Sequence, residues 1–175
     1  SPVTGLWFNI YGGYQDLKNN LASAAIANYS GSYLQLLQGN MHNIYAGAEA
    51  SYSYKDIISF TASGIYRDWK TAKTENNSGD QLLYYMPSFE ANFKVDIRPV
   101  SSVLINLGYQ HITREKIGNE RVDPVGNLYL GGSYEVFEGI SIYVRANNLL
   151  NKDYQYYPGY PTEGINFMGG VSFRF

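Results

Sequence analysis

The sequence predicts an all-β fold: an antiparallel up-and-down transmembrane β-barrel with about eight strands in this chain. Three observations support this prediction. Apolar and polar residues alternate with a period of two through segment after segment, as they do in a strand with two unlike faces. The spacers between these segments alternate between short and long, which is typical of outer-membrane barrels. The 175 residues include 18 tyrosines, and tyrosine suits both strands and membrane interfaces.

Composition excludes several other classes of protein. No run of apolar residues approaches the roughly 18 that a transmembrane helix needs. The chain has no cysteine, so disulfide frameworks and cysteine metal sites are excluded. The formal net charge of −2 gives no reason to expect nucleic acid as a partner.

Eight segments carry the alternation. They cover residues 6–14, 43–54, 58–67, 85–97, 102–110, 127–136, 140–147 and 165–175. The apolar residues have even numbers in the first three segments and in 127–136 and 140–147. They have odd numbers in 85–97, 102–110 and 165–175. The last segment ends on Phe-Arg-Phe and is long enough to cross a bilayer at a tilt, since about 9–11 residues are required.

The spacers predict which ends of the strands lie together. Short turns fall near 55–57, 98–101 and 137–139, and long polar spacers at 15–41, 68–83, 113–126 and 149–163. Short turns of outer-membrane barrels are periplasmic, so both chain termini are expected on the periplasmic side. The first long spacer fits either a short helix or an extension of the flanking strands.

The polar phase of the strands predicts which face is turned to lipid. Eight charged residues share this phase: Glu49, Arg67, Glu90, Lys94, Asp96, Glu135, Arg145 and Arg174. A lipocalin-like barrel would turn the apolar phase inward, whereas here the charges indicate a polar lumen. Aromatic residues near strand ends are predicted to form interfacial girdles: Tyr14, Tyr52, Tyr54, Tyr66, Tyr85, Tyr109, Tyr134 and Phe175. Pro87 lacks an N–H, so a bulge or a loop-proximal position is expected there.

The charges of the polar phase are the candidate site residues. We predict a luminal network in which Glu49 and Glu90 face Lys94, Arg145 and Arg174. Side chains nearly fill an eight-stranded barrel, and buried charges must be paired, so a structural role is favoured over a lumen tuned for a solute.

No catalytic, cofactor or metal site is predicted. His42 and His111 lie at loop ends of strands on the apolar phase, where a lipid-modifying enzyme would need a serine and a carboxylate beside them. No motif gathers such a set, so we interpret both as interfacial residues and expect no enzyme. Residues 76–80, NNSGD, lack the spaced acidic ligands of a calcium loop.

The C-terminal region resembles a known family. The stretch VRANNLLNKDY at 144–154 is similar to the penultimate strand of TonB-dependent outer-membrane receptors, where NLFNKxY recurs. The stretch from Gly159 to Phe175 resembles the ending of the same family, and 46–54 is similar to one of its upstream strands. Leu150 replaces the usual phenylalanine, and Gly164-Ile165-Asn166 replaces Gly-Arg-x.

The resemblance implies a 22-stranded barrel with a plug domain that imports iron chelates, cobalamin or glycans with energy from TonB. Residues 1–175 then form a single barrel domain without a plug, the C-terminal third of a receptor, which supplies transporter wall and extracellular loops. The implied location is the bacterial outer membrane. The implied partners are outer-membrane lipid, the rest of the receptor, TonB, and the barrel-assembly machinery that reads terminal Phe175.

Two alternatives remain open at this point. The chain could be a self-contained eight-stranded barrel that acts as an anchor or adhesin, or a barrel enzyme that uses His42 or His111. In lipid an open sheet edge cannot be satisfied. Segments 6–14 and 165–175 are therefore expected either to pair with each other or to be completed by another chain.

Overall fold

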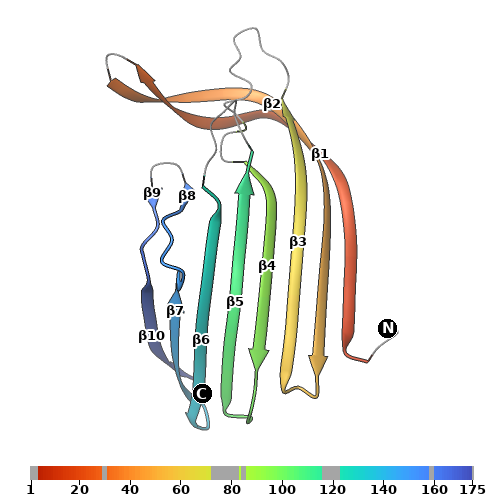
Figure 1. Ribbon diagram of the computed structural model, residues 1–175, viewed down its shortest axis with the longest axis vertical. Coiled ribbons are helices and arrows are strands. Elements are labelled where there is room, and N and C mark those ends of the chain that lie inside the picture. Colours follow the sequence, from red (N-terminus) through yellow and green to blue (C-terminus); the bar gives the residue numbers. More distant parts are fainter. Residues whose placement is uncertain are drawn as a thin grey trace.

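The protein forms one curved antiparallel sheet of eight strands in the order β1-β2-β3-β4-β5-β6-β7-β10 (Figure 1). Its computed structural model describes residues 4–28, 31–71, 83, 86–115, 123–157 and 160–174, with the backbone alone for residues 20–28 and 31–38. The strands are β1 (Leu6–Asn28), β2 (Gly31–Tyr54), β3 (Ile58–Thr71), β4 (Pro87–Ile97), β5 (Val103–Arg114), β6 (Val125–Phe137), β7 (Ile140–Asn147) and β10 (Asn166–Phe173). A separate two-stranded sheet pairs β8 (Gln155–Tyr157) with β9 (Tyr160–Pro161). The predicted up-and-down order of eight strands is confirmed.

Short turns gather at one end of the sheet. They cover residues 55–57, 98–102 and 138–139, as predicted. Lys55 and Asp56 both have positive φ, at 48° and 55°, and Gly139 reaches 80°, where glycine carries no steric penalty. β1 starts and β10 ends at this short-turn end (Figure 1).

The spacer predicted at 15–41 is strand rather than loop. β1 and β2 continue as a hairpin and pair residue by residue as far as Asn28 with Gly31, so the helix alternative is wrong. A register shift between Leu17 and Asn20 marks a bulge, in which Asn19 has a φ of 53° and its N–H donates to Asn40 Oδ1 at 2.9 Å. Tertiary pairing between two equal strands outweighs the polar composition of this segment.

The sheet is not closed. β1 pairs only with β2, and β10 pairs only with β7, in the part of the chain that the structure describes. Figure 1 shows these two strands at opposite edges of the sheet. The sequence offered two ways to satisfy the edges. The first, pairing of segment 6–14 with segment 165–175, does not occur in this structure.

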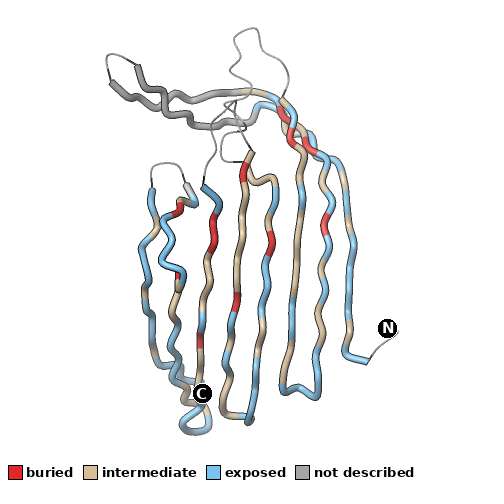
Figure 2. Tube along the Cα trace, viewed as in Figure 1, coloured by how far each residue is buried: buried red, intermediate tan, exposed pale blue. Residues whose placement is uncertain are grey.

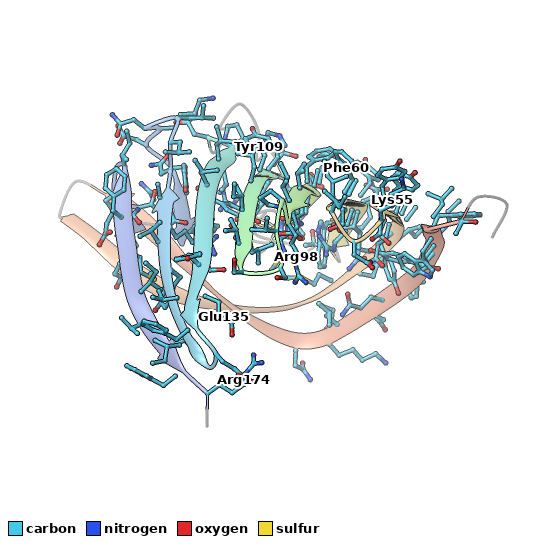
Figure 3. All side chains as sticks on the ribbon, turned by 90° about the horizontal axis from the view of Figure 1, so that it is seen from below. Lys55, Phe60, Arg98, Tyr109, Glu135 and Arg174 are labelled. Atoms are coloured by element: carbon cyan, nitrogen blue, oxygen red, sulfur yellow. The ribbon has the colours of Figure 1, made fainter. Side chains whose placement is uncertain are left out.

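The register places the predicted apolar residues on one face. A single cross-strand row, for example, joins Tyr52, Phe60, Val95, Leu107, Leu130, Ala146 and Phe167. In Figure 3 Phe60 and Tyr109 lie on the outer, convex side of the sheet, and Arg98 and Glu135 on the inner, concave side. The predicted phase is thus preserved across all eight strands, with the polar face concave.

Few of the described residues are buried, and they are scattered along the strands (Figure 2). The cluster at the loop end contains Met41 and Trp69, with Leu17, Leu83 and Met86 against them. Pro87 begins β4 beside a register shift that extends to Phe89, as its missing N–H predicts. Among the described residues, no helix is long and apolar enough to cross a membrane.

Candidate functional site

The concave polar face is the candidate functional site, because strand register gathers the polar side chains there. Each strand contributes every second residue, so side chains from distant segments meet in cross-strand rows. One row joins Asn9, Glu49, Ser63, Asn92, Gln110 and Asn127, from six successive strands. The face therefore offers amide, hydroxyl and carboxyl groups at one level of the sheet.

Tyrosine rings cover glycines on this face. A Cβ placed on Gly47 would lie 2.5 Å from Cζ of Tyr11, and one on Gly170 would lie 2.5 Å from the Tyr143 hydroxyl. Gly108 is covered in the same way by Tyr129. These glycines leave the space that the rings occupy, which fixes the rings flat against the sheet.

The five predicted network residues share the polar face but form separate local contacts. Glu90 pairs with Arg67, and Lys94 pairs with Asp96 at 2.8 Å. Arg145 lies 4.2 Å from the centre of the Tyr129 ring and donates to Asn147 Oδ1 at 2.8 Å. Such contacts neutralise charge locally and need no continuous chain of partners.

Glu49 and Arg174 complete the predicted set. Glu49 is half-buried in the middle of the sheet, and Arg174 is exposed beyond the end of β10. Neither side chain makes an ion pair with another residue that the structure describes. Arg67 and Asp96, which take part in the two ion pairs, share the polar phase but were not among the five network residues. The structure thus shows which charges meet, and the role of the set stays a prediction.

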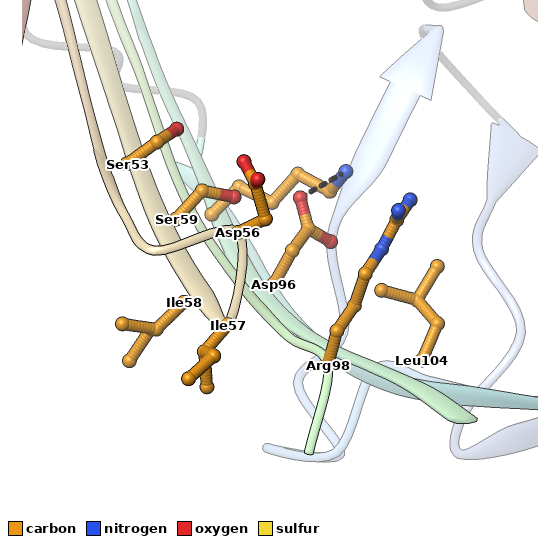
Figure 4. A pocket seen from close by; sticks show the side chains of 9 residues that line it. Ser53, Asp56, Ile57, Ile58, Ser59, Asp96, Arg98 and Leu104 are labelled. Carbon is orange, nitrogen blue, oxygen red and sulfur yellow. Dashed lines mark ion pairs between the residues drawn. The ribbon is translucent and has the colours of Figure 1, made fainter. Parts of the chain in front are cut away.

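A cavity of about 280 Å³ opens on the polar face at the short-turn end (Figure 4). Its polar lining consists of Ser53, Asp56, Ser59, Lys94, Asp96 and Arg98. Oδ1 of Asp96 is buried without a hydrogen-bond partner, which is uncommon for a buried acceptor. The strained turn at Lys55 and Asp56 places one of the lining carboxylates.

Arg114 and Asn148 organise the loop end of the sheet between β5 and β10, a role that the sequence analysis missed. The Arg114 guanidinium is buried and donates to the carbonyl oxygens of Gln155, at 2.6 Å, and of Asp123 and Tyr156, each at 3.4 Å. Asn148 is also buried and has a φ of 51°. The three asparagines at 147, 148 and 151 were the available signal, since asparagine tolerates the left-handed conformation.

The Asn148 side chain ties together both ends of the loop that it begins. Its Nδ2 donates to the carbonyls of Lys152 and Glu163, each at 3.0 Å, and its Oδ1 accepts from the N–H of Lys152 at 3.1 Å. Its own N–H donates to Asn127 Oδ1 at 2.9 Å. One amide therefore satisfies three backbone groups of an otherwise irregular segment.

Two groups at the loop end have shifted pKa values. Burial, and then the neighbouring Asp68 carboxylate, raise the pKa of Glu115. Burial, and then Tyr156, raise the pKa of Tyr154 to about 12. Both groups lie in connections beyond the strands, and both shifts favour the protonated form.

The two histidines lie apart on the convex face. His42 pairs across the sheet with Asp16 and Lys70, and His111 with Ala91 and Gly126. The only hydrogen bond of either ring within the described residues joins His111 Nδ1 and the Tyr109 hydroxyl at 3.5 Å. Neither ring is thus hydrogen-bonded to a serine or a carboxylate among the described residues, and the expectation of no enzyme stays a prediction.

The part of the chain that the structure describes contains no cluster of metal-binding side chains. No group of three or more His, Cys, Asp or Glu residues lies close enough together there to hold an ion. Residues 76–80, considered above as a calcium loop, lie outside the described residues, as do Tyr85 and Phe175.

Comparison with known proteins finds likeness in structure alone. No family model and no curated protein matches the sequence. Among solved structures the chain is similar to the copper transporter OprC, with a TM-score of 0.75 and 18% identity over 99% of this chain and 29% of that chain. It is also similar to the outer-membrane protein OmpT of Vibrio cholerae, with a TM-score of 0.62 and 12% identity over 98% of this chain and 52% of that chain.

These likenesses show the fold. The eight strands match the antiparallel sheet of outer-membrane β-barrels, which confirms the predicted fold class. The chain spans less than a third of the OprC chain and about half of the OmpT chain.

Proposed function

We propose that this chain is part of the wall of a larger outer-membrane β-barrel, a solute-uptake receptor of the TonB-dependent type. The main observation behind the proposal is the open sheet. It has two unpaired edge strands, one polar face and one apolar face, as a segment of a barrel wall would have. The similarity to 29% of a transporter chain supports it. The proposal names no transported solute, because copper is the solute of OprC and low sequence identity does not extend it to this chain.

The free edges support a larger barrel over a self-contained one. An unpaired strand in lipid exposes N–H and C=O groups that nothing else can satisfy, at several kcal/mol each by the usual cost of burying unpaired amides. β1 and β10 are both in this condition. Further strands must pair with them, from the same protein or from another chain.

The convex face supports a lipid environment. Phe8, Ile10 and Phe167 are 60%, 76% and 79% exposed on this face, and no charged residue interrupts the convex-face positions of β3 between Ile58 and Tyr66. A contiguous apolar surface of this kind would be costly in water. Bilayer lipid is therefore the proposed partner of this face.

The bacterial outer membrane is the proposed location. By the usual arrangement of such barrels, the short turns and both termini face the periplasm, and the long connections face outward. Because residues 144–154 resemble TonB-dependent receptors, we propose the rest of such a receptor and TonB as further partners. The barrel-assembly machinery is proposed to read Phe175.

Cysteine cross-linking separates this proposal from the self-contained barrel. Because the chain has no cysteine, pairs can be introduced cleanly at Ile10 and, in turn, at Phe167, Gly169 or Val171. The protein is expressed in outer membranes and oxidised. We expect no disulfide within the chain for any of the three pairs, whereas the pair at Ala50 and Ala62, neighbours in β2 and β3, forms one. Efficient cross-linking of Ile10 to β10 would establish the eight-stranded alternative instead.

Labelling of intact cells tests the orientation. A single cysteine replaces Asp123, in a long connection, or Glu138, in a short turn. A membrane-impermeant maleimide is expected to label the first in intact cells and the second only after the outer membrane is opened. The reverse pattern would contradict the proposed orientation.

A further inference from the structure

Three polar side chains gather on the convex face, toward the loop end of β5 and β6. Tyr109, which Figure 3 shows on this face, and His111 are alternate residues of β5, and the Tyr109 hydroxyl is 3.5 Å from His111 Nδ1. His111 pairs across the sheet with Gly126 of β6. A Cβ placed on Gly126 would lie 3.3 Å from the Tyr109 hydroxyl and 3.9 Å from Cδ of Lys152. The Lys152 chain therefore lies against the same face, and we call Tyr109, His111 and Lys152 the convex polar cluster.

The lysine of this cluster is anchored through its backbone and has no acidic partner. Buried Asn148 accepts a hydrogen bond from the N–H of Lys152 at 3.1 Å and donates one to its carbonyl at 3.0 Å. The Lys152 side chain is exposed and makes no ion pair with another described residue. Lys70, on the convex face of β3, differs because it pairs with Asp68 at 3.1 Å. The Lys152 ammonium is therefore available to an anion from outside the described chain.

Polar groups on a lipid-facing surface require a partner. Ionisable side chains there are costly unless another group compensates them. A lysine ammonium and a tyrosine hydroxyl donate hydrogen bonds, and a histidine ring also carries an N–H donor. Phosphate oxygens are strong acceptors for such donors, above all for a charged one. The headgroup phosphate of a lipid is the partner that a membrane supplies at this face.

An apolar hollow of about 390 Å³ adjoins the cluster on the same face. Its floor consists of alanines and Gly64 on β2, β3 and β4, and the rings of Phe89 and Phe93 form one of its walls. His111 pairs with Ala91 of the floor, and its ring centroid lies 6.3 Å from that of Phe89. A second hollow of about 300 Å³ continues the first toward the short-turn end. The floor lies on strands that are paired on both sides, so further strands beside β1 would leave it open.

We propose that the convex polar cluster and the hollow together bind a membrane lipid that carries a phosphate group. The phosphate accepts hydrogen bonds from the Lys152 ammonium and the Tyr109 hydroxyl, with His111 beside them. An acyl chain of the same lipid lies in the hollow, where it contacts more protein atoms than it would on a filled surface. Basic side chains at a membrane surface favour anionic lipid in this way. This inference rests on the proposed function, in which the convex face meets lipid, and it assigns a specific lipid site to that face.

Three probes that differ in one part each test the inference. The complete protein, purified in neutral maltoside micelles, is titrated with dipalmitoyl phosphatidic acid, with dipalmitoylglycerol or with inorganic phosphate, and bound molecules are counted by native mass spectrometry. We expect phosphatidic acid to fill one saturable site. Dipalmitoylglycerol, which lacks only the phosphate, is expected to bind about ten-fold more weakly, since it loses the charge-assisted hydrogen bonds. Inorganic phosphate, which lacks the acyl chains, is expected to bind more weakly still.

Substitutions separate the two parts of the site. Lys152→Gln is expected to raise the Kd of phosphatidic acid about five-fold, as loss of one lysine near anionic lipid would, and Tyr109→Phe about three-fold. Neither change should affect dipalmitoylglycerol. Gly64→Leu fills the hollow, where a Cβ would meet its nearest atom at 3.7 Å, and should weaken both lipids about three-fold. That effect is small because a chain that leaves the micelle interior gains only packing contacts.

Matched controls lie on the same face. Lys70→Gln removes a convex-face lysine that is paired with Asp68, and Gly132→Leu fills a convex-face position of β6, where a Cβ would also meet its nearest atom at 3.7 Å. Both variants are expected to leave the Kd of phosphatidic acid unchanged. An equal Kd shift for Lys70→Gln and Lys152→Gln would show general attraction to charge and would overturn the inference.

Two further outcomes would also contradict the lipid site. Equal affinity for phosphatidic acid and dipalmitoylglycerol would remove the phosphate from the inference, and equal affinity for inorganic phosphate would assign the cluster to a free anion. A self-contained barrel would turn the same face to lipid, so these readouts do not depend on further strands beside β1 and β10. Absence of lipid binding would thus overturn this inference alone, whereas the cross-link from Ile10 to β10 would overturn the proposed function.

Discussion

Two corners at the loop end of the same sheet are held in opposite ways. The apolar corner, over β1 to β4, consists of Leu17, Met41, Trp69, Leu83 and Met86, which pack side chain to side chain. The polar corner, over β5 to β10, consists of Arg114, Asn148 and Tyr154 with the backbone of the connection at 148–157 and 160–165, whose carbonyls accept hydrogen bonds from Arg114 and Asn148. The comparison shows that the connection after β7, which pairs only with itself through β8 and β9, is held to the large sheet mainly by polar side chains. The connection before β4 is held mainly by apolar contacts, with one hydrogen bond from Trp69 Nε1 to the Pro87 carbonyl.

The two corners should differ in how well they tolerate substitutions of their side chains. Apolar packing depends on volume and accepts similar shapes. Hydrogen bonds to buried carbonyls depend on donors in fixed positions, and loss of a donor leaves the acceptor unsatisfied. The polar corner should therefore respond more strongly to single substitutions than the apolar corner.

The largest effect is expected for Asn148→Ala. It removes three side-chain hydrogen bonds to the backbone of Lys152 and Glu163, and unsatisfied buried groups cost about 1–3 kcal/mol each. We expect a loss of about 4 kcal/mol in the free energy of unfolding, measured by urea in detergent micelles. Asn147→Ala is the control, because its side chain bonds the side chains of Arg145 and Asn166 rather than the backbone of the connection. An equal loss there would refute the special role of Asn148.

Arg114→Met is expected to cost about 3 kcal/mol, because three carbonyls lose their donor. Limited proteolysis should then cut between residues 149 and 165 first. Arg114→Lys should restore little, since one ammonium cannot reproduce the fork of a guanidinium. Full rescue by lysine would mean that charge alone holds the loop.

For the apolar corner, Met41→Ala is expected to cost about 2–3 kcal/mol from cavity formation. Met41→Leu should cost less than about 1.5 kcal/mol, because the volume is conserved. The same urea unfolding measures both variants. If leucine is as harmful as alanine, shape tolerance does not distinguish this corner from the polar one.

Two strand glycines, one near each corner, test whether the difference between the corners is confined to the loop end. Gly47→Ala displaces the Tyr11 ring beneath the apolar corner, and Gly108→Ala displaces Tyr129 beneath the polar corner. Overpacking of this kind costs about 1–3 kcal/mol. We expect the two losses to agree within about 0.5 kcal/mol in urea unfolding, and a large difference would show that the contrast extends into the strands.

The smallest effect concerns alkaline pH. The pKa of Tyr154 is raised from 10.0 to about 12, so the stability that its protonated form contributes is present below pH 10 and is lost as the pH rises through about 12. Absorbance at the tyrosinate band should show one fewer late-titrating tyrosine in Tyr154→Phe. The polar corner should loosen in that range while the Trp69 emission of the apolar corner stays unchanged.

Part of the site could be anticipated from sequence and part could not. The shared phase of Glu49, Glu90 and Lys94 follows from period-two alternation, because alternate residues of a strand share one face. The partner of Glu90 could not be anticipated, since pairing with Arg67 depends on the register between β3 and β4. The role of Arg114 at the loop end was missed because its three acceptors are backbone carbonyls, two of them 41 and 42 residues away, and carbonyls carry no side-chain signature.

The sequence by itself determined the eight alternating segments, their two faces, the short-turn end and an irregularity or strand end at Pro87. These are local properties, set by alternation, turn residues and a missing N–H. Only the tertiary structure decided that 15–41 is a strand hairpin, that the sheet stays open between β1 and β10, and that two corners form. These properties depend on which distant segments pair, and pairing is a sum of many weak contacts that no single segment encodes.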